Sequence, residues 1–138
     1  MYESKNHLAQ AESLAKQEQW LEAERFYIAA CESAADYFNH WHSDAEVIET
    51  TVHCYHRLAR CCWAQGRLDA AVSVCEKIHQ MVLTRLGEPI ASEARLDALL
   101  RASQKASEEL QIYIMRMVTQ AEQVEQKSVC TVSCRGSN

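Results

Sequence analysis

Cysteine and histidine, whose side chains bind metal ions and take part in redox and nucleophilic chemistry, are concentrated in the middle of the chain. Nine of them lie between residues 40 and 79, namely His40, His42, His53, Cys54, His56, Cys61, Cys62, Cys75 and His79. His53 and His56 are one helical turn apart and could share a metal ion, but the sequence contains no CxxC pair and no HExxH motif. Neighbouring Cys61 and Cys62 point about 100° apart on a helix, so they do not easily face one site. We therefore expect no metal and no cofactor, and we keep a metal- or redox-sensing protein as an alternative hypothesis.

Two further cysteines, Cys130 and Cys134, lie in a short polar segment without hydrophobic periodicity. We predict that residues 128–138 form a flexible tail, in which reactive side chains are more often incidental than functional. No motif places a nucleophile on a strained turn beside a base, and no glycine-rich phosphate-binding loop can be written in this chain. We therefore expect that the protein is not an enzyme.

The composition restricts the fold and the partners. The 138 residues include three glycines and one proline, where average usage would give about ten glycines and seven prolines. This shortage excludes a turn-rich β-fold and predicts an all-α protein. The net charge of −5 argues against binding to nucleic acid or to anionic membranes. The chain has seven cysteines, no apolar run near 18 residues and a polar start, which favours reduced thiols in the cytoplasm.

Apolar residues recur at intervals of three and four, which predicts α-helices. The pattern places two helices within residues 5–38, two within 44–86 and one long helix at about 89–126, all in a single domain over 1–127. Ser43 and Glu46 have the spacing of a capping box and predict the start of the third helix.

Residues 11–30 and 59–78 carry the same pattern, 48 residues apart. The matching pairs are Ala11 and Ala59, Trp20 and Leu68, Ala23 and Ala71, Tyr27 and Cys75, and Ala30 and Ile78. This pattern resembles the tetratricopeptide repeat (TPR), a helix–turn–helix unit whose small residues let two helices pack closely. Gly66 falls on the turn glycine of the second unit, whereas Glu18 stands there in the first, and the spacing exceeds the standard repeat of about 34 residues.

The resemblance implies two antiparallel helical hairpins, over about 5–38 and 44–86, with the helix at 89–126 as a cap. An unrelated antiparallel helical bundle is the alternative fold.

The resemblance also implies a function, because the inner helices of such repeats line a groove that binds peptides. It places a local basic strip in or beside that groove, made of His53, His56, Arg57, Arg60 and Trp63 with Lys16 from the first unit. Arginine in such a strip suits acidic side chains or a C-terminal carboxylate. We expect a protein–protein interaction module, an adaptor or a chaperone-like protein, and a structural helical subunit of a larger complex is the rival hypothesis.

One stretch of the last helix, residues 112–118, is apolar almost all round and is interrupted only by Arg116. A helix segment of this kind is usually buried on more than one side. We therefore predict a homodimer through Ile112, Met115 and Val118.

Overall fold

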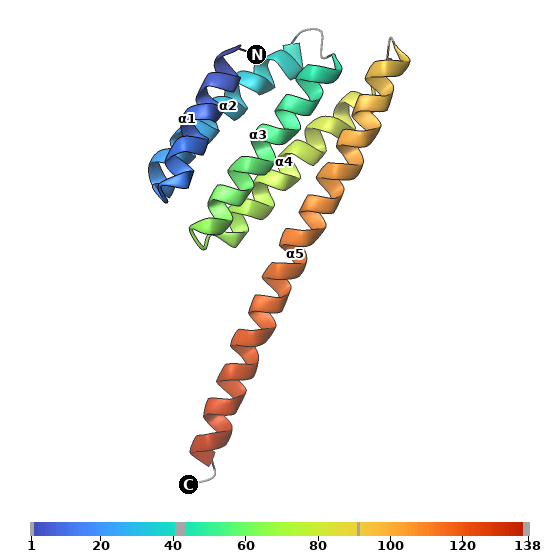
Figure 1. Ribbon diagram of the computed structural model, residues 1–138. Helices are drawn as coiled ribbons and strands as arrows, with labels where there is room; N and C mark the ends of the chain where they lie inside the picture. Colours follow the sequence, from blue (N-terminus) through green and yellow to red (C-terminus); the bar gives the residue numbers. More distant parts are fainter. Residues whose placement is uncertain (1, 41–43, 91, 137–138) are drawn as a thin grey trace.

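The computed structural model describes residues 2–40, 44–90 and 92–136, and within them the chain forms helices and no strand. Five helices follow one another: α1 (Tyr2–Lys16), α2 (Trp20–His40), α3 (Ala45–Ala64), α4 (Leu68–Leu86) and α5 (Glu93–Gly136) (Figure 1). The all-α fold predicted from the shortage of glycine and proline is confirmed. None of these helices, over the part of the chain that the structure describes, is long and apolar enough to cross a membrane.

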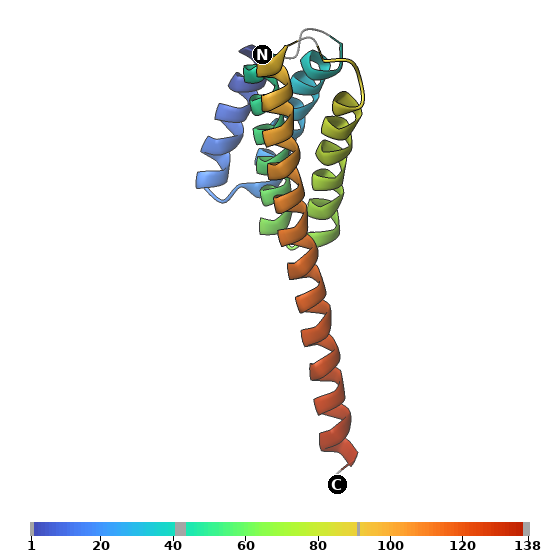
Figure 2. The ribbon, with the colours of Figure 1, turned by 90° about the vertical axis from the view of Figure 1, so that its right-hand side faces the viewer.

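The helices pack mainly against their neighbours along the chain. α1 packs on α2 and α3 packs on α4, each pair antiparallel, while α2 joins the two pairs through α3 (Figure 1). α5 lies against both α3 and α4 and then extends beyond the other four helices (Figures 1 and 2). This arrangement leaves the outer side of α5 at the open end of the stack.

Small residues allow the close helix contacts in the core. Six alanines on the first four helices are completely buried: Ala11, Ala23, Ala30, Ala34, Ala59 and Ala71. Larger residues such as Phe38, Ile48 and Ile78 fill the space around them. Removing one of these larger side chains would leave a cavity at a cost of about 2–5 kcal/mol.

The two turns within the helix pairs have the same backbone geometry, 48 residues apart. Glu18 has φ of 58° and Gly66 has φ of 77°, so the backbone of both residues is in the left-handed helical region. In each turn the N–H of the next residue donates to the carbonyl five residues earlier, at 3.0 Å, which is the Schellman ending of a helix. The repeat in the sequence therefore corresponds to a repeat in the backbone, although glutamate occupies one of the two glycine positions.

Two boundaries differ from the sequence predictions. Asp44, not Ser43, caps α3, because the Asp44 carboxylate accepts the Val47 N–H at 2.9 Å; Ser43 itself lies outside the described residues. Glu46 does not complete a capping box and instead pairs with Lys5 of α1 at 2.6 Å. The last helix begins at Glu93 and continues to Gly136, past the predicted end near residue 126 and into the segment predicted as a tail.

Candidate functional site

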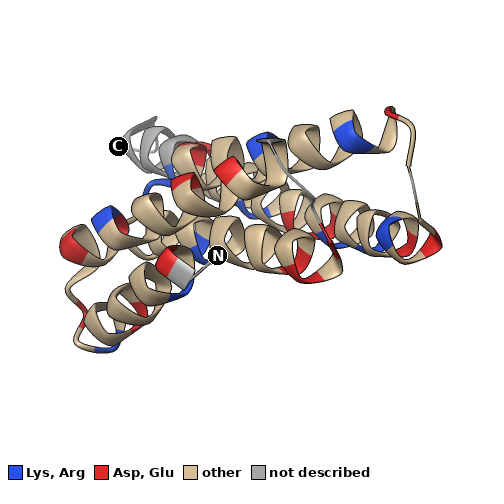
Figure 3. Ribbon diagram, turned by 90° about the horizontal axis from the view of Figure 1, so that it is seen from above, with Lys and Arg blue, Asp and Glu red and all other residues tan. Residues whose placement is uncertain are grey.

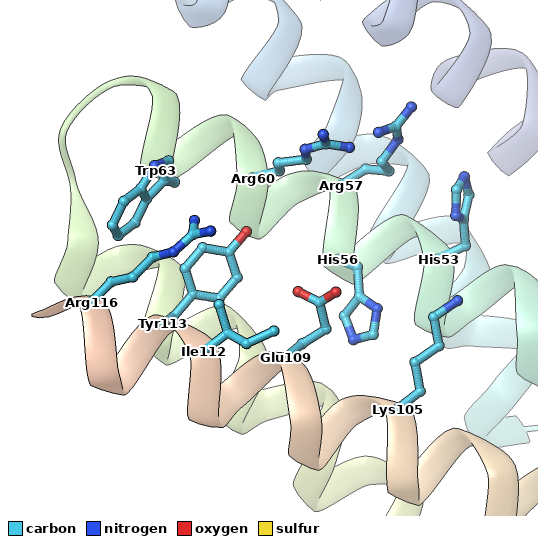
Figure 4. Close-up of a pocket in the computed structure, with 10 residues that line it drawn as sticks. All are labelled: His53, His56, Arg57, Arg60, Trp63, Lys105, Glu109, Ile112, Tyr113 and Arg116. Atoms are coloured by element: carbon cyan, nitrogen blue, oxygen red, sulfur yellow. The ribbon is translucent and has the colours of Figure 1, made fainter.

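A cleft of about 610 Å³ lies between α3 and α5 (Figure 4). Residues three and four apart on each helix line it, because that spacing keeps side chains on one helical face. From α3 these are His53, His56, Arg57, Arg60 and Trp63, and from α5 they are Lys105, Glu109, Ile112, Tyr113 and Arg116.

Two further clefts adjoin this one along α3. One of about 500 Å³ lies against α1 and α2 and shares Arg57, Arg60 and Trp63 with the first. The other, of about 360 Å³, lies towards the N-terminal half of α3 and shares His53 and Lys105 with the first. We call the three together the α3 groove. All six residues predicted for partner binding line it, with Lys16 in the cleft next to α1 and the other five between α3 and α5.

An aromatic contact closes one end of the cleft between α3 and α5. The rings of Trp63 and Tyr113 lie with centroids 5.6 Å apart and tilted by 51°. The guanidinium of Arg116 lies 4.9 Å from the centre of the Trp63 ring, a cation–π contact. Tyr113 is buried, and burial raises the pKa of its phenol. This end of the groove therefore offers flat apolar surface beside a positive charge.

The walls of this cleft carry more positive than negative charge. Arg57 is neutralised by Glu12 of α1, with Nε 2.5 Å from Oε1, and this half-buried pair ties α1 to α3. Arg60 and Lys105 form no ion pair with any residue that the structure describes, and neither does Glu109, the single carboxylate in the lining. Acidic and basic residues are otherwise spread over all five helices (Figure 3), so this positive excess is local to the groove.

The two histidines of the cleft are held in their neutral form. His56 is only 8% exposed, and burial, with smaller effects from Lys105 and His53, lowers its pKa to about 4. Its Nε2 has no hydrogen-bond partner among the described residues, and its ring lies between Glu109 and Lys105 (Figure 4). Burial, Arg57 and Lys105 also lower the pKa of His53. A ligand that brings a polar atom to His56 would satisfy a buried group that now lacks a partner.

The α5 side of the cleft could not be predicted from the sequence. Lys105, Glu109 and Arg116 resemble a solvated helix face, and only the packing of α5 on α3 turns them into a wall. Of the three residues predicted as dimer contacts, Ile112 lies in this wall, and all three, Ile112, Met115 and Val118, are exposed.

The five cysteines whose side chains the structure describes lie in the core. Cys31, Cys54, Cys61, Cys62 and Cys75 are all buried free thiols. Burial raises the pKa of Cys54, Cys61 and Cys62 to about 11 and that of Cys75 to about 12, and it also raises that of Cys31. No group of three or more His, Cys, Asp or Glu side chains in the described part of the chain could hold a metal ion. His40, His42, Cys130 and Cys134 fall outside the side chains that the structure describes.

No curated protein and no solved structure matches this chain. A family model described as a protein of unknown function, DUF2753, matches residues 4–135, which is nearly the whole chain. The chain therefore belongs to the DUF2753 family.

Proposed function

We propose that this protein is a non-enzymatic interaction module that binds an acidic segment, or the C-terminal carboxylate, of a partner protein in the α3 groove. The observation that carries the proposal is a pair of cations, Arg60 and Lys105, on facing walls of one cleft. Neither has a carboxylate partner among the residues that the structure describes. Arg116 adds a third positive charge beside the Trp63 ring. A protein of net charge −5 that gathers cations in a groove has a surface suited to anions.

The chemistry favours carboxylates as the recognised group. A guanidinium such as that of Arg60 can donate two parallel hydrogen bonds to a carboxylate, and hydrogen bonds to charged groups contribute about 1.5–3 kcal/mol each. Trp63 and Tyr113 provide apolar surface for a side chain next to the bound carboxylate. The ligand would therefore combine at least one acidic group with a neighbouring apolar or aromatic residue.

The length of the groove favours a peptide over a small molecule. The adjoining clefts follow α3, whose 20 residues extend over about 30 Å. An extended peptide advances about 3.3 Å per residue, so about nine residues could lie along the helix. The equivalent turns at Glu18 and Gly66 support the interpretation of the fold as TPR-like, and the grooves of TPR proteins bind peptides. The buried free thiols support a reducing compartment, which we propose to be the cytoplasm.

A selection from a random peptide library with free C-termini tests this function. We expect the wild-type protein to enrich peptides rich in Asp and Glu, and a synthetic copy of such a peptide to bind at least about tenfold more weakly to Arg60→Glu, since one charge-assisted contact is lost. Arg60 is a better choice than Arg57, because Arg57 also holds α1 through Glu12.

Arg25→Glu is the matched control, since Arg25 is an exposed arginine on α2 that does not line the groove. If the selected peptides are not acidic, or if Arg60→Glu binds them as well as Arg25→Glu does, the proposed function is wrong.

A further inference from the structure

Among the described residues, the lining of the cleft between α3 and α5 includes one carboxylate, that of Glu109. Glu109 is half-buried in the α5 wall and forms no ion pair with any residue that the structure describes. The other charged side chains of this lining are those of arginine and lysine. A partner that brought only negative charge into the cleft would therefore be repelled at Glu109.

Lys105 and Glu109 present opposite charges in succession along the α5 wall. They are four residues apart on one face of the helix, which corresponds to about 6 Å along its axis. They do not pair with each other within the described structure, and a lysine that precedes a glutamate is the less favourable order for a pair within a helix. The ring of His56 lies between them (Figure 4), and burial lowers its pKa to about 4, so it is neutral at pH 7. The α5 wall therefore offers one positive and one negative contact, side by side.

The spacing of these two charges matches the spacing of side chains in an extended peptide. Successive residues of such a peptide point to opposite sides, so residues two positions apart share a side and lie about 6.6 Å apart. An extended segment along α5 can therefore place one side chain on Lys105 and the next one of the same side on Glu109. The side chains of the other set point to the α3 wall, where Arg60 lies.

The position of Glu109 makes its charge effective within the cleft. Glu109 lies between α3 and α5 (Figure 4), where water shields charges less than it does at an open surface. After burial itself, Glu109 is the largest cause of the raised pKa values of Tyr113 and Cys75. A basic side chain in contact with Glu109 would compensate a negative charge that acts on the packed interface of the helices.

We infer that the α3 groove recognises a segment of mixed charge, in which a lysine or arginine lies two positions from an aspartate or glutamate. The basic side chain of the segment contacts Glu109, and the acidic side chain contacts Lys105. A further acidic group, pointing to the opposite wall, contacts Arg60. This inference rests on the proposed function, and it adds that Glu109 determines which acidic segments the groove accepts.

A selection from the same random peptide library, analysed position by position, tests this inference. We expect the wild type to enrich peptides in which Lys or Arg occurs two positions from Asp or Glu. Glu109→Lys should replace this basic preference by an acidic one and retain the other acidic positions. Glu108→Lys is the matched control, because Glu108 is the neighbouring glutamate, is exposed and does not line the groove. This control changes the net charge by the same amount and should select the same peptides as the wild type.

A synthetic copy of one selected peptide tests the contact without any change to the protein. Replacing its basic residue by glutamate should weaken binding to the wild type at least about tenfold, because like charges would then meet at Glu109. The altered peptide should bind Glu109→Lys more tightly than it binds the wild type, whereas Glu108→Lys should not improve its binding. Circular dichroism establishes that both variants remain helical, and the peptide replacement decides the question if Glu109→Lys does not fold.

The results distinguish failure of this inference from failure of the proposed function. If the wild type enriches acidic peptides without a basic residue two positions from an acidic one, the inference is wrong and the proposed function stands. The same holds if replacing the basic residue leaves the affinity for the wild type unchanged, or if Glu109→Lys selects the same peptides as Glu108→Lys. Selected peptides that are not acidic would overturn both.

Discussion

Replacing His56 by leucine removes a buried group that must stay uncharged in the folded chain. We expect His56→Leu to make the protein less sensitive to mild acid than the wild type. His56 is buried between α3 and α5, where Lys105 and His53 add positive charge and Glu109 lies beside the ring (Figure 4). A proton on this imidazole would be poorly hydrated and close to other cations, and so the folded chain takes it up reluctantly.

The size of the effect follows from the pKa of His56 in the two states. The pKa is about 4 in the folded chain and 6.5 for an unperturbed histidine. Below pH 6.5 His56 is therefore protonated more readily in the unfolded chain than in the folded chain. This lowers the free energy of unfolding progressively as the pH falls towards 4. Between about pH 7.5 and about pH 5 the loss amounts to about 2 kcal/mol.

Urea unfolding at these two pH values measures the loss. The wild type and His56→Leu share every other titrating group, so the difference between their pH dependences isolates His56. We expect this difference to be about 2 kcal/mol in favour of His56→Leu at the lower pH. At the higher pH the variant should be at least as stable as the wild type, because Nε2 of His56 has no hydrogen-bond partner to lose within the described part of the chain.

The control is His79→Leu, which removes a histidine on α4 outside the lining of the groove. If the wild type and His56→Leu lose the same free energy of unfolding between the higher and the lower pH, the reasoning is refuted. It would mean that the folded chain protonates His56 as readily as the unfolded chain does, and hence that water fills the cleft at this point.

Three further predictions concern the turns, the end of α2 and the thiols. Glu18→Gly should stabilise the protein and Gly66→Ala should destabilise it, each by about 1 kcal/mol in urea unfolding, because both positions have the left-handed backbone conformation that favours glycine. A Cβ at Gly66 meets nothing within 4 Å, so the effect there comes from the backbone alone. A Gly66→Ala variant with the stability of the wild type would contradict this. Arg85→Met should cost about 2 kcal/mol in thermal unfolding, because it leaves two carbonyls at the end of α2 without their donor; an unaltered Tm would show that water replaces the guanidinium. The five buried thiols should react with Ellman's reagent only as the chain unfolds, in a variant whose two C-terminal cysteines are serine; rapid reaction of the folded chain would favour the redox-sensing hypothesis.

The parts of the fold that local physics determines were predictable from the sequence. Helical periodicity located the four shorter helices, and the 48-residue match located equivalent turns at Glu18 and Gly66. The α3 side of the groove was predicted through the resemblance to the TPR, and its residues share one helical face because they lie three and four apart. The choice of Asp44 over Ser43 was not, because both residue types cap helices and only the backbone conformation decides between them.

The remaining features depend on packing between distant parts of the chain. Whether Lys105 and Arg116 face solvent or a neighbouring helix depends on where α5 lies on α3, and no local pattern determines this. The end of α5 was missed for a different reason. A polar composition suggested a tail, but no glycine or proline occurs between Pro89 and Gly136 to stop the helix.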